Sequence, residues 1–125
     1  MSIPVDLAGL AEVMGRYRFA YLLTSSERGA PHALAVTPVL QGGELLVDEA
    51  GRRTRDNAEK RPEVALVWPP QSESDYSLIV DGRAVVTRGG LRIAPERAVL
   101  HRPTAPQQPA AAGACGSDCV EIARG

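Results

Sequence analysis

The stretch GRRTRDNAEKRP, residues 51–62, gathers the residue types best suited to bind an anion. It predicts a short helix that begins near Gly51 to Arg53 and ends at Pro62, because proline cannot continue a helix without losing a backbone donor. Backbone N–H groups at a helix start and a forked guanidinium can together hold phosphate oxygens. Arg53 and the hydroxyl of Thr54 stand at this start, and Asn57 follows one turn later. The stretch therefore predicts a site for a phosphate monoester.

The same stretch has a plainer interpretation as a charged surface helix. Arg55, Glu59, Lys60 and Arg61 would then only solvate one helix face. The context favours a site, since the helix joins two apolar runs, ELLVD and EVALVW, that are typical of strands. A helix start fixed against a rigid sheet is what a preorganised site requires. From the residues alone, both interpretations stay open.

Apolar runs separated by turn residues predict five or six strands. FAYLLTS and HALAVTPVL flank the turn SERGAP, and QGG leads tightly into ELLVD. EVALVW follows the helix, and YSLIVDGRAVVT forms a long strand with a bend or bulge at Asp81-Gly82. RGGLRI offers a last short strand. The first two runs predict a pair of antiparallel strands, and the third is expected to pair with the second as a hairpin or meander.

Two further short helices are expected at the ends of this region. Asp6 can cap a helix on which Leu7, Leu10, Met14 and Tyr17 recur along one face. APERAVLHR starts with Pro95 near a first helical position and is expected to form one or two helical turns that end at His101. Strands with short helices between them predict a mainly β fold, a small barrel.

Length and composition limit the function classes. The chain has 125 residues, 44% hydrophobic and 23% charged, which is typical of one globular domain. Its formal net charge of −1 gives no long-range field for nucleic acid or an anionic membrane. The start MSIPVDLAGL has no basic leader, and no segment approaches the roughly eighteen apolar residues of a membrane span. We therefore expect a cytoplasmic location.

The chain is expected to divide into a folded domain, residues 1–102, and a flexible tail, residues 103–125. The segment PTAPQQPAAAGACG has little large apolar content to offset the entropy of ordering it. Cys115 and Cys119 lie in this tail and could pair only in an oxidising compartment. Together with His101 they do not define a closed metal centre. We expect inert thiols and no metal site.

The order of these blocks resembles a known family, the FMN-binding split barrels related to pyridoxamine 5′-phosphate oxidase. The resemblance covers about Leu7 to Arg88 and rests on TSSERGAPHALAVTPVL, ELLVDEAGRRTRDNAEKRPEVALVW and YSLIVDGRAVV. The middle block is the most specific of the three. The resemblance implies a mainly β fold with short helices, a six-stranded antiparallel split β-barrel.

The resemblance also implies a cofactor, a set of site residues and a partner. Arg53 and Thr54, followed by Asn57, would bind the phosphate of FMN. Residues of two strands would surround the isoalloxazine: Ala35, Val36 and Thr37 from the second strand, Val47 and Asp48 from the third. Such sites lie between two subunits, so the resemblance implies a homodimer.

The family resemblance leaves the reaction open. The lysine common at the position of Thr54 is absent, and related barrels bind the deazaflavin coenzyme F420 or haem instead of FMN. A C-terminal motif with paired basic residues is also missing, so pyridoxamine phosphate oxidation itself is not expected. Because a flavin carries the redox chemistry, no catalytic residue is named. The expectation is an FMN-dependent oxidoreductase acting on a small molecule; the alternatives are a non-catalytic carrier and a cofactor-free scaffold.

Overall fold

The computed structural model of the chain describes residues 1–104. These residues form eight strands and two short α-helices, with one turn of 3-10 helix. In chain order the elements are β1 (Ser2–Val5), the 3-10 turn η1 (Leu7–Gly9), α1 (Leu10–Met14), β2 (Ala20–Ser25), β3 (Pro31–Val36), β4 (Val39–Gln41), β5 (Glu44–Val47), α2 (Arg52–Lys60), β6 (Glu63–Trp68), β7 (Ser77–Val86) and β8 (Leu91–His101). The tail residues 105–125, including Cys115 and Cys119, lie outside the described residues.

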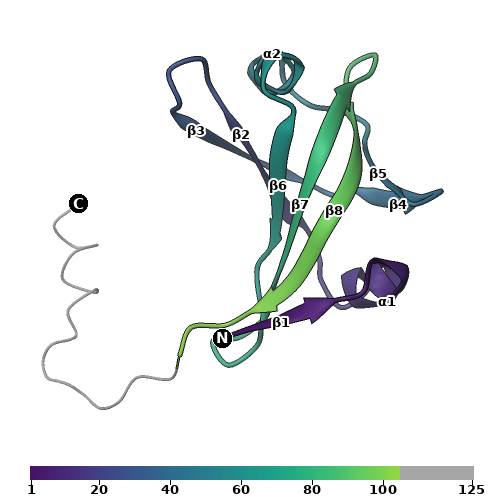
Figure 1. Ribbon diagram of the computed structural model, residues 1–125, viewed down its shortest axis with the longest axis vertical. Helices are drawn as coiled ribbons and strands as arrows, with labels where there is room; N and C mark the ends of the chain where they lie inside the picture. The colour runs from purple at the N-terminus through teal and green to yellow at the C-terminus, as the bar shows by residue number, and fades with distance from the viewer. Residues whose placement is uncertain (105–125) are drawn as a thin grey trace, which may run out of the picture.

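All eight strands belong to one antiparallel sheet that curls on itself (Figure 1). Its order is β3-β2-β6-β7-β8-β5-β4, and β1 pairs with β8 beside this path. The two α-helices lie at opposite ends of the curled sheet in Figure 1. This arrangement confirms the predicted fold class, mainly β with short helices in a split barrel.

The predicted second strand is divided in the structure. The run HALAVTPVL forms β3, which pairs with β2, and β4, which pairs with β5. Thr37 and Pro38 lie between them, where the proline cannot donate to a ladder. Gly42 and Gly43, at φ 61° and 82°, then make the tight turn into β5. This division and the unpredicted β1 raise the strand number from the expected six to eight.

The helix predicted from Pro95 is wrong, because this segment belongs to β8. β8 runs without interruption from Leu91 to His101 and pairs with β7 along its whole length. The pairing of Pro95 with Gly82 and of Arg97 with Asp81 leaves Glu96 as the extra residue of a bulge. A bulge accommodates the missing donor of Pro95, so long-range pairing prevails over the local helix signal. The irregularity predicted at Asp81-Gly82 is confirmed, but the extra residue lies on β8 and not on β7.

The N-terminal helix is shorter than predicted. The Asp6 carboxylate accepts a hydrogen bond from the Ala8 N–H at 3.1 Å, which confirms the predicted cap. One 3-10 turn and the five residues of α1 follow, and the helix ends before Gly15. Leu10 is completely buried and anchors the segment in the core.

One face of the sheet is buried and forms the core. Its largest completely buried side chains come from five of the eight strands, β2, β5, β6, β7 and β8: Leu22, Leu45, Leu66, Leu78, Val80, Leu91 and Ile93. Trp68 is 3% exposed and belongs to this core. None of the helices that the structure describes has the length and apolar character needed to span a bilayer.

The opposite face of the sheet is also apolar over several strands but is not buried. The pairing of Tyr21 with Ala35 and Val67, and of Leu23 with Ala33 and Ala65, places these side chains on one face. Each of them is exposed or half-buried, and Tyr21 is 42% exposed. We call this surface, with Ile79 opposite Val67, the outer apolar face.

Candidate functional site

The N-terminus of α2 is electrostatically unusual. No side chain among residues 1–104 caps it, and the N-cap residue is Gly51. Its first turn holds Arg52 and Arg53 and no acidic residue. A helix N-terminus carries a partial positive charge, so two cations beside it repel the helix dipole. An anion at this place would relieve that repulsion and accept hydrogen bonds from the free N–H groups of the first turn.

Two side chains hold α2 against β2: Asn57, within the helix, and Arg61, its C-cap residue. The Asn57 amide nitrogen donates to the Thr24 hydroxyl oxygen at 3.1 Å, and both residues are buried. Four residues later, Arg61 Nε donates to the Ser25 carbonyl oxygen at 2.8 Å. The two bonds reach consecutive residues of β2, so they fix the position of α2 against the sheet.

A polar hollow of about 740 Å³ lies between α2 and the β2–β3 hairpin. We call it the basic hollow, because five of its lining residues are arginine or lysine and two are acidic. Its lining residues are Ser26, Glu27, Arg28, Ala30, Pro31, His32, Arg52, Arg53, Asp56, Asn57, Lys60 and Arg61.

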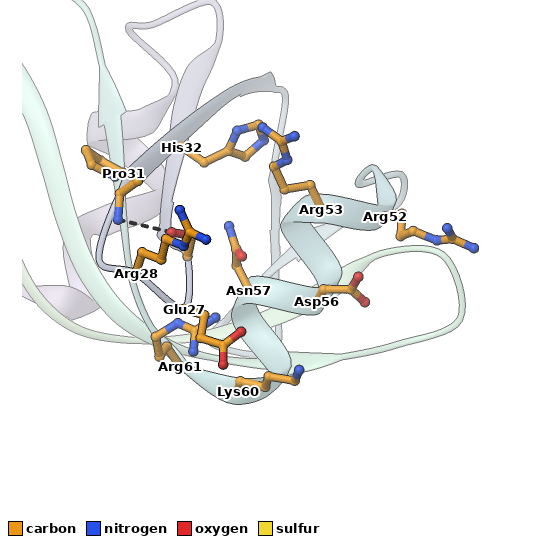
Figure 2. Close-up of a pocket in the computed structure, with 12 residues that line it drawn as sticks. Glu27, Arg28, Pro31, His32, Arg52, Arg53, Asp56, Asn57, Lys60 and Arg61 are labelled. Carbon is orange, nitrogen blue, oxygen red and sulfur yellow. Dashed lines mark hydrogen bonds between the residues drawn. The ribbon is translucent and has the colours of Figure 1, made fainter.

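The side chains of the basic hollow do not all point inward. Figure 2 shows the Arg53 guanidinium and the His32 ring directed toward one another across the top of the hollow. The Asn57 amide and Arg28 extend into its middle, whereas Arg52 points away from it. Arg53 is therefore better placed than Arg52 to contact a ligand.

The cations of the basic hollow carry no salt bridge within residues 1–104. The three salt bridges of this region lie on the strands and join Arg83 to Glu63, Arg92 to Glu44, and Arg97 to Asp81. Glu27 and Asp56 line the same hollow, yet neither pairs with a neighbouring arginine. Within the described residues the hollow therefore has more basic than acidic side chains, and none of its arginines or lysines is in a salt bridge.

A second hollow, of about 390 Å³, lies where β3 and β5 end. It is lined by Ala35, Val36, Thr37, Val47, Asp48 and Glu49, and we call it the strand-end hollow. The β7–β8 turn packs tightly against the chain that leaves β5, where the Ala50 N–H donates to the Gly89 carbonyl oxygen at 2.9 Å. A Cβ atom on Gly90 would lie 2.0 Å from the Val47 carbonyl oxygen, so only glycine fits there.

Seven of the eight residues predicted for the site line one or the other of these two hollows. Arg53 and Asn57 line the basic hollow. Ala35, Val36, Thr37, Val47 and Asp48 all line the strand-end hollow. β3 connects the two hollows, since His32 and Ala35 lie about 10 Å apart along a strand. Seven of the predicted residues thus border two hollows that β3 connects.

Thr54 lies apart from both sets of lining residues. It is 1% exposed, and its hydroxyl has no hydrogen-bond partner among residues 1–104. With Ala58 it forms the face of α2 that packs on the sheet. Only its backbone N–H, at the third position of the helix, remains free for a ligand.

Among the lining residues that the sequence did not predict for the site are four with basic side chains: Arg28, His32, Lys60 and Arg61. Lys60 and Arg61 were assigned to a solvated face, and Arg28 to a turn. The signal that could have found Arg28 and His32 is the hairpin register, in which Thr24 pairs with His32 and Ser25 with Pro31. This register brings both residues beside α2.

Tyr17 and Tyr76 are joined by a hydrogen bond away from the candidate site. Burial raises the pKa of the Tyr17 phenol, which donates a hydrogen bond to the Tyr76 carbonyl oxygen at 2.8 Å. This pair lies among the residues of a separate small hollow lined by Arg16, Gln71 and Asp75. It belongs to neither hollow of the candidate site. Within the described residues, no three His, Cys, Asp or Glu side chains are grouped to hold a metal ion.

Comparison with known proteins finds close relatives of undescribed function. No family model matches the chain. An uncharacterized protein of Mycobacterium bovis is 44% identical over 132 residues, an alignment that covers 93% of each chain. An uncharacterized protein of Mycobacterium tuberculosis matches to the same extent.

Solved structures share the fold at low sequence identity. A FAD-binding protein of Mesorhizobium loti matches with a TM-score of 0.63 and 12% identity, over 79% of this chain and 94% of that one. A pyridoxinephosphate oxidase family protein of Clostridium acetobutylicum matches with a TM-score of 0.59 and 14% identity, over 78% of this chain and 91% of that one. A haem storage protein of Vibrio cholerae matches with a TM-score of 0.54 and 15% identity, over 74% of this chain and 91% of that one. At such identities these likenesses describe the fold alone.

Proposed function

Since the chain belongs to one family with the two mycobacterial proteins and has the fold of the flavin-binding split barrels, we propose that it binds FMN. The proposal places the phosphate at the N-terminus of α2, beside Arg53. It places the isoalloxazine at the strand-end hollow. The protein is then a homodimeric flavoprotein that acts as an oxidoreductase on a small molecule.

The uncapped, cationic start of α2 is the observation that carries this proposal. Arg52 and Arg53 stand at the positive end of a helix dipole, an arrangement that costs stability unless an anion compensates it. A phosphate monoester supplies that anion and accepts from the N–H groups of Arg53 and Thr54. The Arg53 guanidinium adds a charge-assisted fork. The side chain of Thr54 is buried, so Thr54 acts here through its backbone.

Asn57 contributes to the proposed phosphate site in two ways. One hydrogen of its amide group is used by Thr24, and the other remains available at the wall of the basic hollow. The bond to Thr24 fixes the direction of the amide, so this donor is preorganised. Asn57 therefore supports the phosphate both by holding α2 in place and by offering a neutral donor.

The strand-end hollow suits the ring of the same cofactor. Ala35, Val36 and Thr37 offer a strand terminus with small side chains, and Val47 with Asp48 closes the opposite side. The spacing of about 10 Å along β3 leaves room for a ribityl chain between ring and phosphate. A bound flavin would supply hydride or electron transfer. The protein's own residues would orient the ring and exclude water from it.

The outer apolar face is the proposed dimer surface. Tyr21 and its apolar neighbours on β3 and β6 lie exposed or half-buried on an otherwise well-packed sheet. Contiguous apolar surface of this kind marks interaction sites more often than it marks free protein surface. Ala35 belongs both to this face and to the strand-end hollow. A partner subunit on this face would therefore also cover the flavin ring.

The composition of the basic hollow favours a phosphorylated cofactor over haem. Among its lining residues only Ala30 and Pro31 are apolar, so the faces of a porphyrin would find few apolar contacts there. Several charged donors suit phosphate oxygens instead. The deazaflavin F420 also carries a phosphate, as a diester, and is the alternative that the hollow leaves open.

An absorbance spectrum and a titration test the proposal. Protein purified without added cofactor is expected to show flavin absorbance, and stripped protein is expected to bind FMN with one site per chain. A Soret band would instead indicate haem, and a deazaflavin spectrum F420. Turnover of a reduced nicotinamide then distinguishes an oxidoreductase from a carrier. A colourless protein that binds none of these cofactors would refute the proposal and support a cofactor-free scaffold.

A further inference from the structure

A small hollow at the α1 end of the curled sheet has residues of both charges in its lining. We call it the α1-end hollow; it measures about 250 Å³ and is lined by Arg16, Tyr17, Gln71, Asp75, Tyr76 and Leu100. None of these residues lines the basic hollow or the strand-end hollow. Figure 1 shows α1 and α2 at opposite ends of the sheet. Drug-sized ligands usually occupy about 300 to 1,000 Å³, so this hollow suits a small metabolite.

The walls of the α1-end hollow are held together by hydrogen bonds between distant segments. Gln71 Nε2 donates to the Arg16 carbonyl oxygen at 3.1 Å, and the Tyr17 hydroxyl donates to the Tyr76 carbonyl oxygen at 2.8 Å. These bonds join the chain that leaves α1 to the loop between β6 and β7. The Arg102 guanidinium carbon lies 4.3 Å from the centroid of the Tyr76 ring and supports that ring. The hollow is therefore preorganised.

The two charged residues of this hollow do not neutralise each other. The three salt bridges found among residues 1–104 involve neither Arg16 nor Asp75. Both charges nevertheless act on the Tyr17 phenol, whose pKa is raised mainly by burial, lowered by Arg16 and raised by Asp75. A cation and an anion thus lie near the same phenol without pairing. This arrangement suits a ligand that carries both complementary charges.

Apolar surface completes the hollow on the core side of the sheet. Leu100 pairs with Leu78, which is completely buried, whereas the next residue of β7, Ile79, belongs to the outer apolar face. Because side chains alternate along a strand, Leu78 and Leu100 lie on the core face. The hollow therefore lies away from the proposed dimer surface. Leu100 and the Tyr76 ring offer apolar contacts to a ligand.

We propose that the α1-end hollow binds a free α-amino acid with an apolar side chain. Arg16 pairs with its carboxylate, Asp75 pairs with its ammonium group, and Leu100 contacts its side chain together with the Tyr76 ring. The Tyr17 hydroxyl uses its proton on Tyr76, so its oxygen can accept a bond from the ammonium group. A dicarboxylate would be repelled by Asp75, and a diamine by Arg16. The site shares no residue with the proposed FMN site and does not depend on it.

Titration of amino acids and their blocked forms into the full-length protein tests this proposal. L-Leucine and L-phenylalanine carry both charges, leucinamide lacks the carboxylate, and N-acetylleucine lacks the ammonium group. Isothermal titration calorimetry compares wild type with Arg16→Gln and Asp75→Asn. The matched controls are Arg18→Gln and Glu73→Gln, at exposed residues of the same two segments that lie outside the hollow. Arg16 and Asp75 are themselves exposed, so the fold is expected to survive their replacement.

The proposal predicts a separate loss for each charge. Wild type should bind leucine at least about tenfold more tightly than either blocked form, because each blocked form lacks one charged contact. Arg16→Gln should abolish the preference for leucine over leucinamide and retain the preference over N-acetylleucine. Asp75→Asn should have the reverse effect. Both control variants should keep both preferences.

Three results would overturn the α1-end site. The first is no binding of leucine or phenylalanine at about 10 mM, and the second is equal affinity for leucine and its blocked forms. The third is an equal loss in Arg16→Gln and Arg18→Gln, which would indicate only a general effect of charge. FMN titration of the same proteins separates the two proposals. FMN binding without amino-acid binding would refute the α1-end site alone.

Discussion

Arginines on the strands and arginines around α2 differ in what neutralises them. Arg83, Arg92 and Arg97 each lie within 3.1 Å of a carboxylate on a neighbouring strand. Arg28 and Arg53, at the basic hollow, have no such partner among residues 1–104, although Glu27 and Asp56 line the same hollow. The strand arginines are part of a balanced surface. Those at the hollow have no carboxylate partner within residues 1–104.

The comparison also separates stability from binding. Exposed ion pairs on strands contribute little to stability, commonly about 0.2 to 1 kcal/mol. Unpaired cations at a helix N-terminus cost stability, by about 0.3 to 1 kcal/mol each. Residues retained at such a cost are candidates for function. Strand ion pairs therefore add slightly to the free energy of unfolding, whereas the cations at the start of α2 lower it.

Loss of the Arg53 side chain should give the largest effect. Arg53→Ala is expected to weaken FMN binding by about 1.5 to 3 kcal/mol, because it removes a charged hydrogen-bond donor from the phosphate. The matched control is Arg52→Ala, one residue earlier and pointing away from the hollow (Figure 2). It should leave the FMN dissociation constant within about twofold. Flavin fluorescence quenching measures both, and equal losses in the two variants would exclude a specific role for Arg53.

Removing the Asn57 side chain should cost stability as well as affinity. Asn57→Ala leaves the buried Thr24 hydroxyl without its donor, at a cost of about 1 to 3 kcal/mol in the free energy of unfolding. Urea unfolding measures this loss. Adding Thr24→Val should recover part of it, since both polar partners are then absent. Additive losses in the double variant would show that the two residues do not act as a pair.

Reversing the charge at Arg52 should stabilise the protein without ligand. Arg52→Glu places a carboxylate in the first turn of α2, where it interacts favourably with the helix dipole. The expected gain is about 0.3 to 1 kcal/mol, falling as salt is added. The midpoint of urea unfolding at low and high salt measures it. A loss of stability would contradict the repulsion argued for this helix start.

Breaking a strand ion pair should have the smallest effect. The Arg83 and Glu63 side chains are 56% and 75% exposed, so solvent screens their interaction. Arg83→Ala should therefore cost at most about 1 kcal/mol and leave FMN affinity unchanged. The same unfolding and quenching measurements apply. A clear loss of FMN affinity in this variant would contradict the distinction between the strand arginines and those at the basic hollow.

Local sequence patterns predicted much of the fold. β2, β6 and α2 lie where alternating apolar runs and a proline stop place them, and the bulge at Asp81-Gly82 was visible as a glycine within a strand. β8 was missed in part, because Pro95 imitates a helix start while the pairing with β7 is long-range. The sequence did not predict β1, because a strand of four residues that pairs with the distant β8 gives little local pattern.

The candidate site was only partly predictable for the same reason. The start of α2 could be predicted from one stretch of sequence. The rotation of α2, which buries Thr54 and turns Asn57 toward the hollow, is set by packing against β2 and β7. The contribution of Arg28 and His32 depends on the register of a hairpin. The rotation of a helix and the register of a hairpin depend on contacts with other segments, so the spacing of residues within one segment does not predict them.

The measurement that tests the account most directly is the ratio of riboflavin to FMN dissociation constants for the wild-type protein. The two ligands share the ring and ribityl chain and differ only in the phosphate. A phosphate seat at α2 predicts that FMN binds at least about tenfold more tightly, and that high salt reduces this advantage. Equal affinities for riboflavin and FMN would contradict the assignment of the phosphate to the start of α2.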